Sequence, residues 1–255
     1  MAEIKWKLDK KNTADYLALC RRAVEDDKVF ANFRHLPPMD MIVENSPFKS
    51  GVEYYECIET QFPDLFAHFR EFMKSDRIGS PYKHQIGPYE ISPTTLRYIK
   101  TIGDLHNFFG PLEGQDIVEI GGGYGGLCKI IQDVYDVKSY TIYDLPEAIE
   151  LQRKFLHKFG IRPKFLDKPV PPGNIDLLIA MYSWSELSHD LQNEYLTDVI
   201  SRSKNCYIML NYDMDYSYQL LKDAFPNAEI TDHNLFYDDA NTEYAPYNRF
   251  VIIKN

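Results

Sequence analysis

The residues with the clearest chemical potential form a glycine cluster after a short apolar run. Val118-Glu119-Ile120 leads directly into the segment Gly121–Gly126, in which only Tyr124 carries a side chain. Glycines let a backbone turn tightly and approach a bound cofactor, because no Cβ stands in the way. Asp144 ends the next apolar run, and a carboxylate there can accept hydrogen bonds from both hydroxyls of an adenosine ribose. Since ligands bind at the carboxyl ends of parallel strands, we expect both features to face one crevice.

Two cofactors fit this arrangement. The spacing Gly121-x-Gly123-x-x-Gly126 matches the dinucleotide-binding pattern, which is a weak signal alone. Glu119 stands two positions before the first glycine, and its charge would attract the ammonium group of S-adenosylmethionine (SAM) but repel a pyrophosphate. The loop therefore favours SAM over NAD. A glycine-rich turn without a ligand is the remaining alternative, and the position of Asp144 argues against it.

The elements around this loop alternate regularly. Ser92-Pro93 predicts the start of a helix that ends before Gly110-Pro111. Apolar runs then predict strands, and periodic segments predict the helices between them. The predicted strands are 116–120, 139–143, 163–166, 175–181, 206–210 and 249–254, and the helices between them include 146–159 and 191–202. This order indicates right-handed βαβ units and a mostly parallel sheet covered on both faces.

The first ninety residues differ from the rest of the chain. They predict helices with irregular links and no strand, so we divide the chain into a helical cap or lid, 1–91, and an α/β domain, 92–255. Aromatic residues are dense between positions 30 and 75. We expect this aromatic density to be exposed, which indicates a lid or an interface between copies of the chain.

Composition excludes several classes of function. The chain has 255 residues, 38 acidic and 28 basic, giving a net charge of −10. Because binding along a phosphate backbone usually requires a positive surface, a nucleic-acid polymer is not an expected partner. The four cysteines are far apart, which argues against a zinc site. No segment has the ~20 apolar residues of a membrane span, so we expect a soluble protein of the reducing cytoplasm.

Five ordered blocks of the chain resemble a family of bacterial and viral sugar O-methyltransferases that use SAM. The blocks are GPYEISPTTLRYIK at 87–100, IVEIGGGYGG at 117–126, YDLPE at 143–147, YSWSELS at 182–188 and CYIMLN at 206–211. The resemblance fades before residue 80 and is loose at 243–248. It implies a Rossmann-like class I methyltransferase fold: a seven-stranded, mostly parallel sheet whose last strand is antiparallel. It also implies methyl transfer to a hydroxyl of a nucleotide sugar or a glycan end.

Methyl transfer to a sugar hydroxyl needs a base, because such a hydroxyl is a poor nucleophile at neutral pH. The loop after strand 175–181 opens over the crevice and carries Glu186 and His189. Glu186 belongs to a matching block, and His189 titrates in the useful pH range. The alternatives are a helix-start carboxylate and a solvated first-turn histidine. His84 and Asp213 are the other candidates.

Further residues are assigned by position and by the resemblance. Arg97 is expected to bind the SAM carboxylate or an acceptor phosphate, unless it forms a surface ion pair. Trp184 either stacks on a sugar or adenine ring or packs within its loop. The other expected cofactor ligands are Thr95, Tyr124, Leu145, Asp167 and Ser183, and the other expected acceptor ligands are His84, Tyr89 and Asp213.

Alternatives of metal binding and of function remain open. Asp213-Met-Asp215 has the spacing of a Mg²⁺ or Mn²⁺ site, although acidic residues are also favoured at a helix start. A phenolic or polyketide acceptor would need the same fold. An NAD-dependent oxidoreductase or epimerase shares the glycine pattern, but neither Tyr182 nor Tyr195 after strand 175–181 has the lysine four positions later that such epimerases show. A non-catalytic module that binds a partner is the fourth possibility.

Overall fold

A seven-stranded sheet forms the centre of the molecule. The computed structural model describes residues 10–170, 173–211, 214–226, 231–233 and 249–254. Within them the strands lie in the order β5-β4-β3-β6-β7-β9-β8, and β9 runs antiparallel to both of its neighbours while the other pairs are parallel. This Rossmann-like sheet with an antiparallel last strand confirms the expected fold. The strands are β3 (Asp116–Ile120), β4 (Ser139–Tyr143), β5 (Lys164–Leu166), β6 (Ile175–Met181), β7 (Ser203–Leu210), β8 (Thr231–His233) and β9 (Arg249–Lys254).

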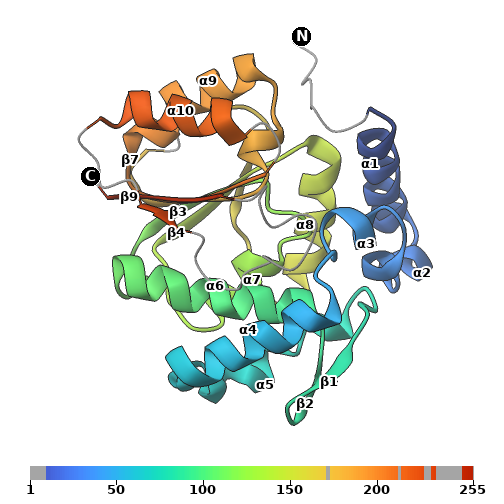
Figure 1. The fold of residues 1–255 in the computed structure, drawn as a ribbon. Helices are drawn as coiled ribbons and strands as arrows, with labels where there is room; N and C mark the ends of the chain where they lie inside the picture. Colours follow the sequence, from blue (N-terminus) through green and yellow to red (C-terminus); the bar gives the residue numbers. More distant parts are fainter. Residues whose placement is uncertain (1–9, 171–172, 212–213, 227–230, 234–248, 255) are drawn as a thin grey trace.

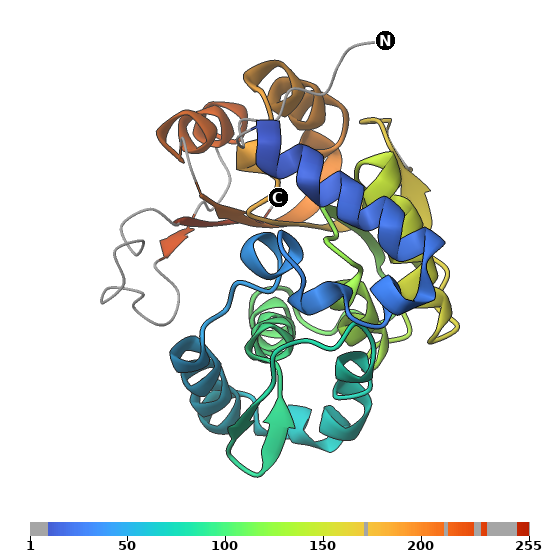
Figure 2. The same ribbon diagram turned by 90° about the vertical axis from the view of Figure 1, so that its right-hand side faces the viewer.

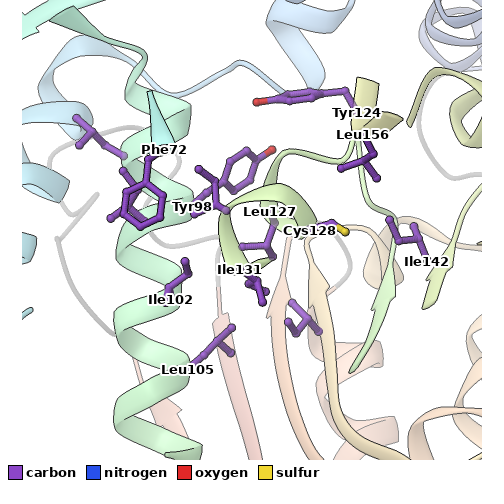
Figure 3. Close-up of a cluster of buried hydrophobic side chains, with 14 of the residues drawn as sticks. Phe72, Tyr98, Ile102, Leu105, Tyr124, Leu127, Cys128, Ile131, Ile142 and Leu156 are labelled. Carbon is purple, nitrogen blue, oxygen red and sulfur yellow. The ribbon is translucent and has the colours of Figure 1, made fainter. Parts of the chain in front are cut away.

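Helices cover both faces of this sheet (Figures 1 and 2). On one face pack α6 (Pro93–Phe109), α7 (Gly126–Gln132) and α8 (Pro146–His157), and on the other α9 (His189–Asp198) and α10 (Met214–Ala224). Figure 3 shows Ile102 and Leu105 of α6 opposite Leu127 and Ile131 of α7. Because side chains alternate along a strand, Ile117 faces this first layer and Val118 faces the second.

The N-terminal segment adds a further layer outside α6 and α8. It contains α1 (Lys10–Glu25), α2 (Asp27–Phe30), α3 (Met39–Ile42), α4 (Phe48–Gln61) and α5 (Phe69–Phe72). In Figure 1, α4 runs beneath α6, and α4 contacts α6 while α1 contacts α8. One continuous hydrophobic core includes Leu19, Phe72, Leu96 and Ile117. The two parts proposed on either side of residue 91 therefore share one hydrophobic core, and the division into a cap and a domain stays an interpretation.

The aromatic residues between 30 and 75 are mostly inside. Phe33, Phe69 and Phe72 are buried, whereas Phe48 is one of the few large apolar side chains that is exposed. The expectation of exposed aromatic density is therefore wrong for most of these rings, because they lie in the core that α6 shares with the N-terminal helices. Self-association through this region stays a prediction without that support.

A short hairpin interrupts the helical N-terminal segment, contrary to the expectation of no strand there. β1 (His84–Ile86) pairs with β2 (Tyr89–Ile91) in antiparallel register. Gly87 takes a φ of +54°, the left-handed conformation that a two-residue hairpin turn needs at its first central position. Each strand has only three residues, too few for an alternation to be recognised in the sequence.

The helix start at Ser92-Pro93 is confirmed. Ser92 Oγ accepts a hydrogen bond from the Thr94 N–H, and Pro93 occupies the first helical position of α6. All four cysteines are buried free thiols, as small core residues would be. Among the described residues, no helix is long and apolar enough to cross a membrane.

Replacing Gly103 of α6 by alanine tests the packing of the N-terminal segment on this helix. A Cβ at Gly103 would come closer than 3.0 Å to the ring of Phe62. In a free helix this change stabilises by ~1 kcal/mol, but overpacking costs ~1–3 kcal/mol. We therefore expect Gly103→Ala to lower the free energy of unfolding by about 1–2 kcal/mol, measured by urea titration.

The control for that experiment is Asn107→Ala, an exposed position on the same helix. Helix propensity alone acts there, so this variant should gain ~0.5 kcal/mol. A Gly103→Ala protein as stable as the Asn107→Ala protein would show that α4 does not pack on α6 as described.

Candidate functional site

An open pocket lies at the carboxyl ends of the central strands, with about 310 Å³ of empty space when the open solvent at its mouth is included. The strand order reverses between β3 and β6, and such a switch point is where open α/β sheets bind ligands. The residues around the pocket come from the ends of β3, β4, β5 and β6 and from α9. They are Ile120, Gly121, Tyr143, Asp144, Leu145, Asp167, Ser183, Leu187, Leu191 and Tyr195. Five sequence-predicted cofactor residues thus meet in one place: Gly121, Asp144, Leu145, Asp167 and Ser183.

The switch point requires glycine at position 121. Gly121 has a φ of +75°, and its N–H donates to the Tyr143 carbonyl oxygen at 2.8 Å. A Cβ there would come closer than 3.0 Å to the Ser183 side chain. The Ser183 hydroxyl in turn donates to the Ile120 carbonyl. The ends of β3 and β6 are therefore joined through a contact that a larger residue would block.

The rest of the glycine loop is covered. Gly123 takes a φ of +57° and Gly125 one of +95°, values at which L side chains are strained. The rings of Tyr98 and Tyr124 lie against Gly126, the first residue of α7, so closely that no Cβ fits. The N-terminus of α7 is thus buried under aromatic rings, and Gly121 and Gly123 are the partly exposed glycines of the loop.

Asp144 is held in place at the pocket wall. One carboxylate oxygen accepts from the Leu145 N–H at 2.8 Å and the other from Gln152 Nε2 at 2.6 Å. Burial raises the pKa of Asp144 to about 6, and these hydrogen bonds oppose the rise. Each oxygen can accept more than one hydrogen bond. Asp144 can therefore be ionised near neutral pH and still accept from ligand hydroxyls.

Glu119 does not line the pocket. Its side chain points to the face of the sheet opposite to that of Ile120. It is 3% exposed and accepts a hydrogen bond from the Tyr140 hydroxyl at 2.8 Å. Burial raises the pKa of Glu119 to about 8, so the carboxyl is mostly protonated at pH 7. The expected pairing of a charged Glu119 with a ligand ammonium is absent from this arrangement, because strand alternation turns the side chain towards α7.

The two candidate bases differ in surroundings, and neither is among the residues around the pocket. Glu186 is partly buried and accepts from Asn211 Nδ2 at 2.7 Å. Burial raises the pKa of Glu186 to about 7, which the Asn211 amide opposes. His189 is exposed at the start of α9 and stacks on Tyr216 with ring centroids 3.6 Å apart. Tyr182 precedes both at a φ of +68°, a conformation that non-glycine residues adopt rarely and mostly at turns or functional sites.

Three expected cofactor ligands lie away from the pocket. Thr95 is buried and donates to Asp76 Oδ1 at 2.6 Å. Arg97 is partly buried, and it hydrogen-bonds the Val43 carbonyl and Asn45 Oδ1 at 2.9 and 3.0 Å. Tyr124 is fully buried and packs within the protein, although we expected it to be a cofactor ligand. Their roles in cofactor binding stay predictions, because none of these three residues lines the pocket.

The expected acceptor ligands are scattered. Trp184 is fully buried, and its indole N–H donates to the Gln192 carbonyl at 3.3 Å. Because no face of its ring is open for stacking on a ligand, Trp184 packs within its loop. Tyr89 lies among Tyr55, Phe66 and Phe69, and His84 is exposed on the hairpin beside Phe48. Asp213 is outside the described residues.

Sequence reasoning missed several residues of the site. Gln152 of α8, the helix that follows Asp144, holds this carboxylate. The available signal in the sequence was a polar residue at helical spacing from the apolar Ile149 and Phe155. Tyr143, Leu187, Leu191 and Tyr195 supply apolar walls. They are strand-end and helix residues whose types do not distinguish a pocket wall from a core. Among the described residues, no group of three or more acidic, histidine or cysteine side chains is arranged to hold a metal.

Comparisons with known proteins give one short sequence match. No protein-family model matches the chain. Over 62 residues it is 27% identical to a demethylspheroidene O-methyltransferase of Rhodobacter capsulatus, a segment that is 24% of this chain and 16% of the relative. The chain therefore matches about a sixth of the length of that relative.

Solved structures with a similar arrangement include methyltransferases. A magnesium protoporphyrin IX methyltransferase from Synechocystis PCC 6803, solved with bound SAM, has a TM-score of 0.47 and 13% identity over 83% of this chain and 100% of its own. A methyltransferase from Pyrococcus furiosus has a TM-score of 0.46 and 13% identity over 75% of this chain and 98% of its own.

Proposed function

We propose that this protein is a SAM-dependent methyltransferase. The observation that carries the proposal is the pocket in which Asp144 and Gly121 meet at the switch point of the sheet. The carboxylate of Asp144 would accept from the ribose hydroxyls of an adenosine. Asp167, directly after β5, would accept from the adenine amino group, and Leu145 would lie beside the purine; both residues line the pocket. The local match to an O-methyltransferase agrees with this assignment.

The covered helix N-terminus favours SAM over a dinucleotide. In dinucleotide sites the pyrophosphate sits at the N-terminus of the helix after the glycine loop. Here the rings of Tyr98 and Tyr124 pack against Gly126, the first residue of α7, which favours a ligand that does not need this helix N-terminus. Because Glu119 is buried and largely neutral, the preference for SAM rests on this packing and not on the charge of Glu119.

The acceptor that we propose is a hydroxyl of a sugar, as a nucleotide sugar or at a glycan end. The support is the resemblance of five ordered blocks to sugar O-methyltransferases. A second candidate is a small apolar or phenolic hydroxyl compound. The 27% identity to demethylspheroidene O-methyltransferase favours that candidate.

The chain's own residues would bind, orient and deprotonate. A bound SAM would supply an electrophilic methyl group on a sulfonium. Asp144 and the backbone at Gly121 would orient that group, and alignment of the acceptor oxygen with it can supply several kcal/mol of the barrier. Glu186 is proposed as the base, since burial brings its pKa to about 7, where a base balances availability and strength at neutral pH. His189 is the alternative base.

Binding of S-adenosylhomocysteine by Asp144 variants tests the cofactor. Calorimetry should show binding of this product and none of NAD. Asp144→Asn should weaken it about 10-fold to 100-fold, because a hydrogen bond to a charged group is worth ~1.5–3 kcal/mol. The wild-type affinity should fall as the pH drops through 6, where protonation removes acceptor capacity from Asp144. The affinity of Asp144→Asn should be flat over that range.

The matched control for this experiment is Asp176→Asn. Asp176 lies near the opposite end of β6, bound to the Asp116 N–H and to Lys204. It should bind the product as the wild type does. Wild-type protein that binds NAD, or that binds neither compound, would refute the proposed function.

The acceptor is identified by mass spectrometry of products from SAM and a panel of hydroxyl compounds. The panel should contain nucleotide sugars, free glycans, phenols and hydroxylated isoprenoids. We expect a gain of one methyl group on a sugar. Methylation confined to phenols or isoprenoids would replace the sugar by the second candidate and leave the methyltransferase proposal intact.

Two variants identify the base once an acceptor is known. Glu186→Gln should lower kcat about 100-fold or more, since general-base catalysis contributes ~10²–10⁴-fold, with little change in the affinity for S-adenosylhomocysteine. His189→Ala should change kcat by less than about threefold under the same principle. The reverse pattern would assign the base to His189, and two near-normal variants would place it elsewhere.

A further inference from the structure

A buried arginine of the N-terminal segment forms the centre of a polar network. Arg34 lies in the 3₁₀ turn Phe33–His35 and is 0% exposed. Its Nε donates to Glu44 Oε1 at 2.6 Å, and its Nη1 donates to Asp76 Oδ1 and to the Ser75 carbonyl, both at 3.1 Å. A guanidinium suits this place because its planar fork can bind several acceptors at once.

The two carboxylates of the network also bind the start of α6. Asp76 Oδ2 accepts from the Ser92 N–H at 2.8 Å, and Glu44 Oε2 accepts from the Ser92 hydroxyl at 3.1 Å. Thr95 donates to Asp76 Oδ1 at 2.6 Å. Two buried negative charges thus face one positive charge, and the donors of α6 compensate the excess.

Arg34 also contacts the glycine loop. Its guanidinium carbon lies 4.6 Å from the centroid of the Tyr124 ring, a favourable cation–π geometry. The other neighbours of this ring are Phe33, Tyr98 and Phe155, with centroids 4.9–6.3 Å away. Tyr124 is the single side chain between Gly121 and Gly126, so it is the only side-chain anchor that this segment has.

Two further contacts from the N-terminal segment reach the same loop. The Tyr16 hydroxyl of α1 donates to the Gly123 carbonyl at 3.3 Å, and Gln152 Nε2 donates to the same carbonyl at 3.1 Å. A Cβ at Gly123 would lie 3.1 Å from a methyl group of Val43. Val43 is next to Glu44 in the chain, so the Arg34 network also fixes the residue that covers Gly123.

We propose that Arg34 is a positioning residue, which holds the cofactor loop in its binding conformation through the ring of Tyr124. The proposal rests on the proposed function, because it assigns the loop to SAM. Glycines lose more conformational freedom on ordering than other residues. If the loop is ordered before binding, the free energy of binding does not include the entropy lost on ordering it. If the loop is released from Tyr124, binding must order it and the affinity falls.

Affinity for S-adenosylhomocysteine in three variants tests this role. Arg34→Lys keeps the charge but loses the planar fork, and Tyr124→Leu removes the ring. Each should weaken binding about 10-fold, equal to ~1.4 kcal/mol. Tyr124→Phe keeps the ring and removes a hydroxyl that has no hydrogen-bond partner among the described residues. It should bind within about twofold of the wild type.

The double variant Arg34→Lys/Tyr124→Leu separates positioning from general destabilisation. If Arg34 acts through Tyr124, the second change adds less than about threefold, because the two effects are coupled. Independent effects would multiply to about 100-fold. Lys100→Gln is the control: Lys100 is also buried and pairs with Asp104 at 2.5 Å on α6, away from the loop. It should lower Tm without changing the affinity.

Hydrogen exchange without ligand gives a second readout. Amides of 121–126 should exchange faster in Arg34→Lys and Tyr124→Leu, and at the wild-type rate in Lys100→Gln. If Arg34→Lys does not fold, the two Tyr124 variants still decide the role of the ring.

Three results would overturn the proposal. They are unchanged affinity and exchange in Tyr124→Leu, unchanged values in a folded Arg34→Lys, and independent effects in the double variant. Wild-type protein that does not bind S-adenosylhomocysteine would instead refute the proposed function, and the exchange rates would still report whether Arg34 anchors the loop.

Discussion

The structure depends on how closely two strand ends approach each other. β3 and β6 are parallel neighbours, and the chain goes on from β3 to β4 on one side and from β6 to β7 on the other. Their ends meet where Gly121 lies against Ser183 without room for a Cβ. That contact places the start of the loop beside the end of β4, since the Gly121 N–H also binds the Tyr143 carbonyl. Asp144, the next residue, is thereby brought to the same pocket.

Much of the sheet could be predicted because burial on both faces leaves a strong signal. The bounds of β3, β4, β6 and β9 agree with the apolar runs in the sequence, and the helix signal at Ser92-Pro93 is equally local. The hairpin β1–β2 and the strand β8 could not be found in this way. Each strand has three residues, and a pairing that short is decided by its turn and its neighbours in space.

The residues of the candidate site could likewise be predicted only in part. Gly121 and Asp144 could be placed because strand ends fix backbone positions, whereas the directions of side chains depend on the face they occupy. The alternation of side chains along β3 predicts one of these directions. Because Ile120 lines the pocket, Glu119 must face the opposite layer of helices. Trp184 could not be placed, because a large ring in a loop satisfies a core and a ligand site equally well. Its indole N–H bond to Gln192 decides for the core.

Burial changes the electrostatic role of Glu119. Its pKa is raised to about 8, so it carries less charge at neutral pH than an exposed glutamate would. The surroundings of the loop are instead set by packing from outside the sheet: the rings of Tyr98 and Tyr124 lie against Gly126 at the start of α7. Arg34 lies against the ring of Tyr124 from the N-terminal segment. Helices that resemble a separate cap in the sequence therefore pack directly against the glycine loop.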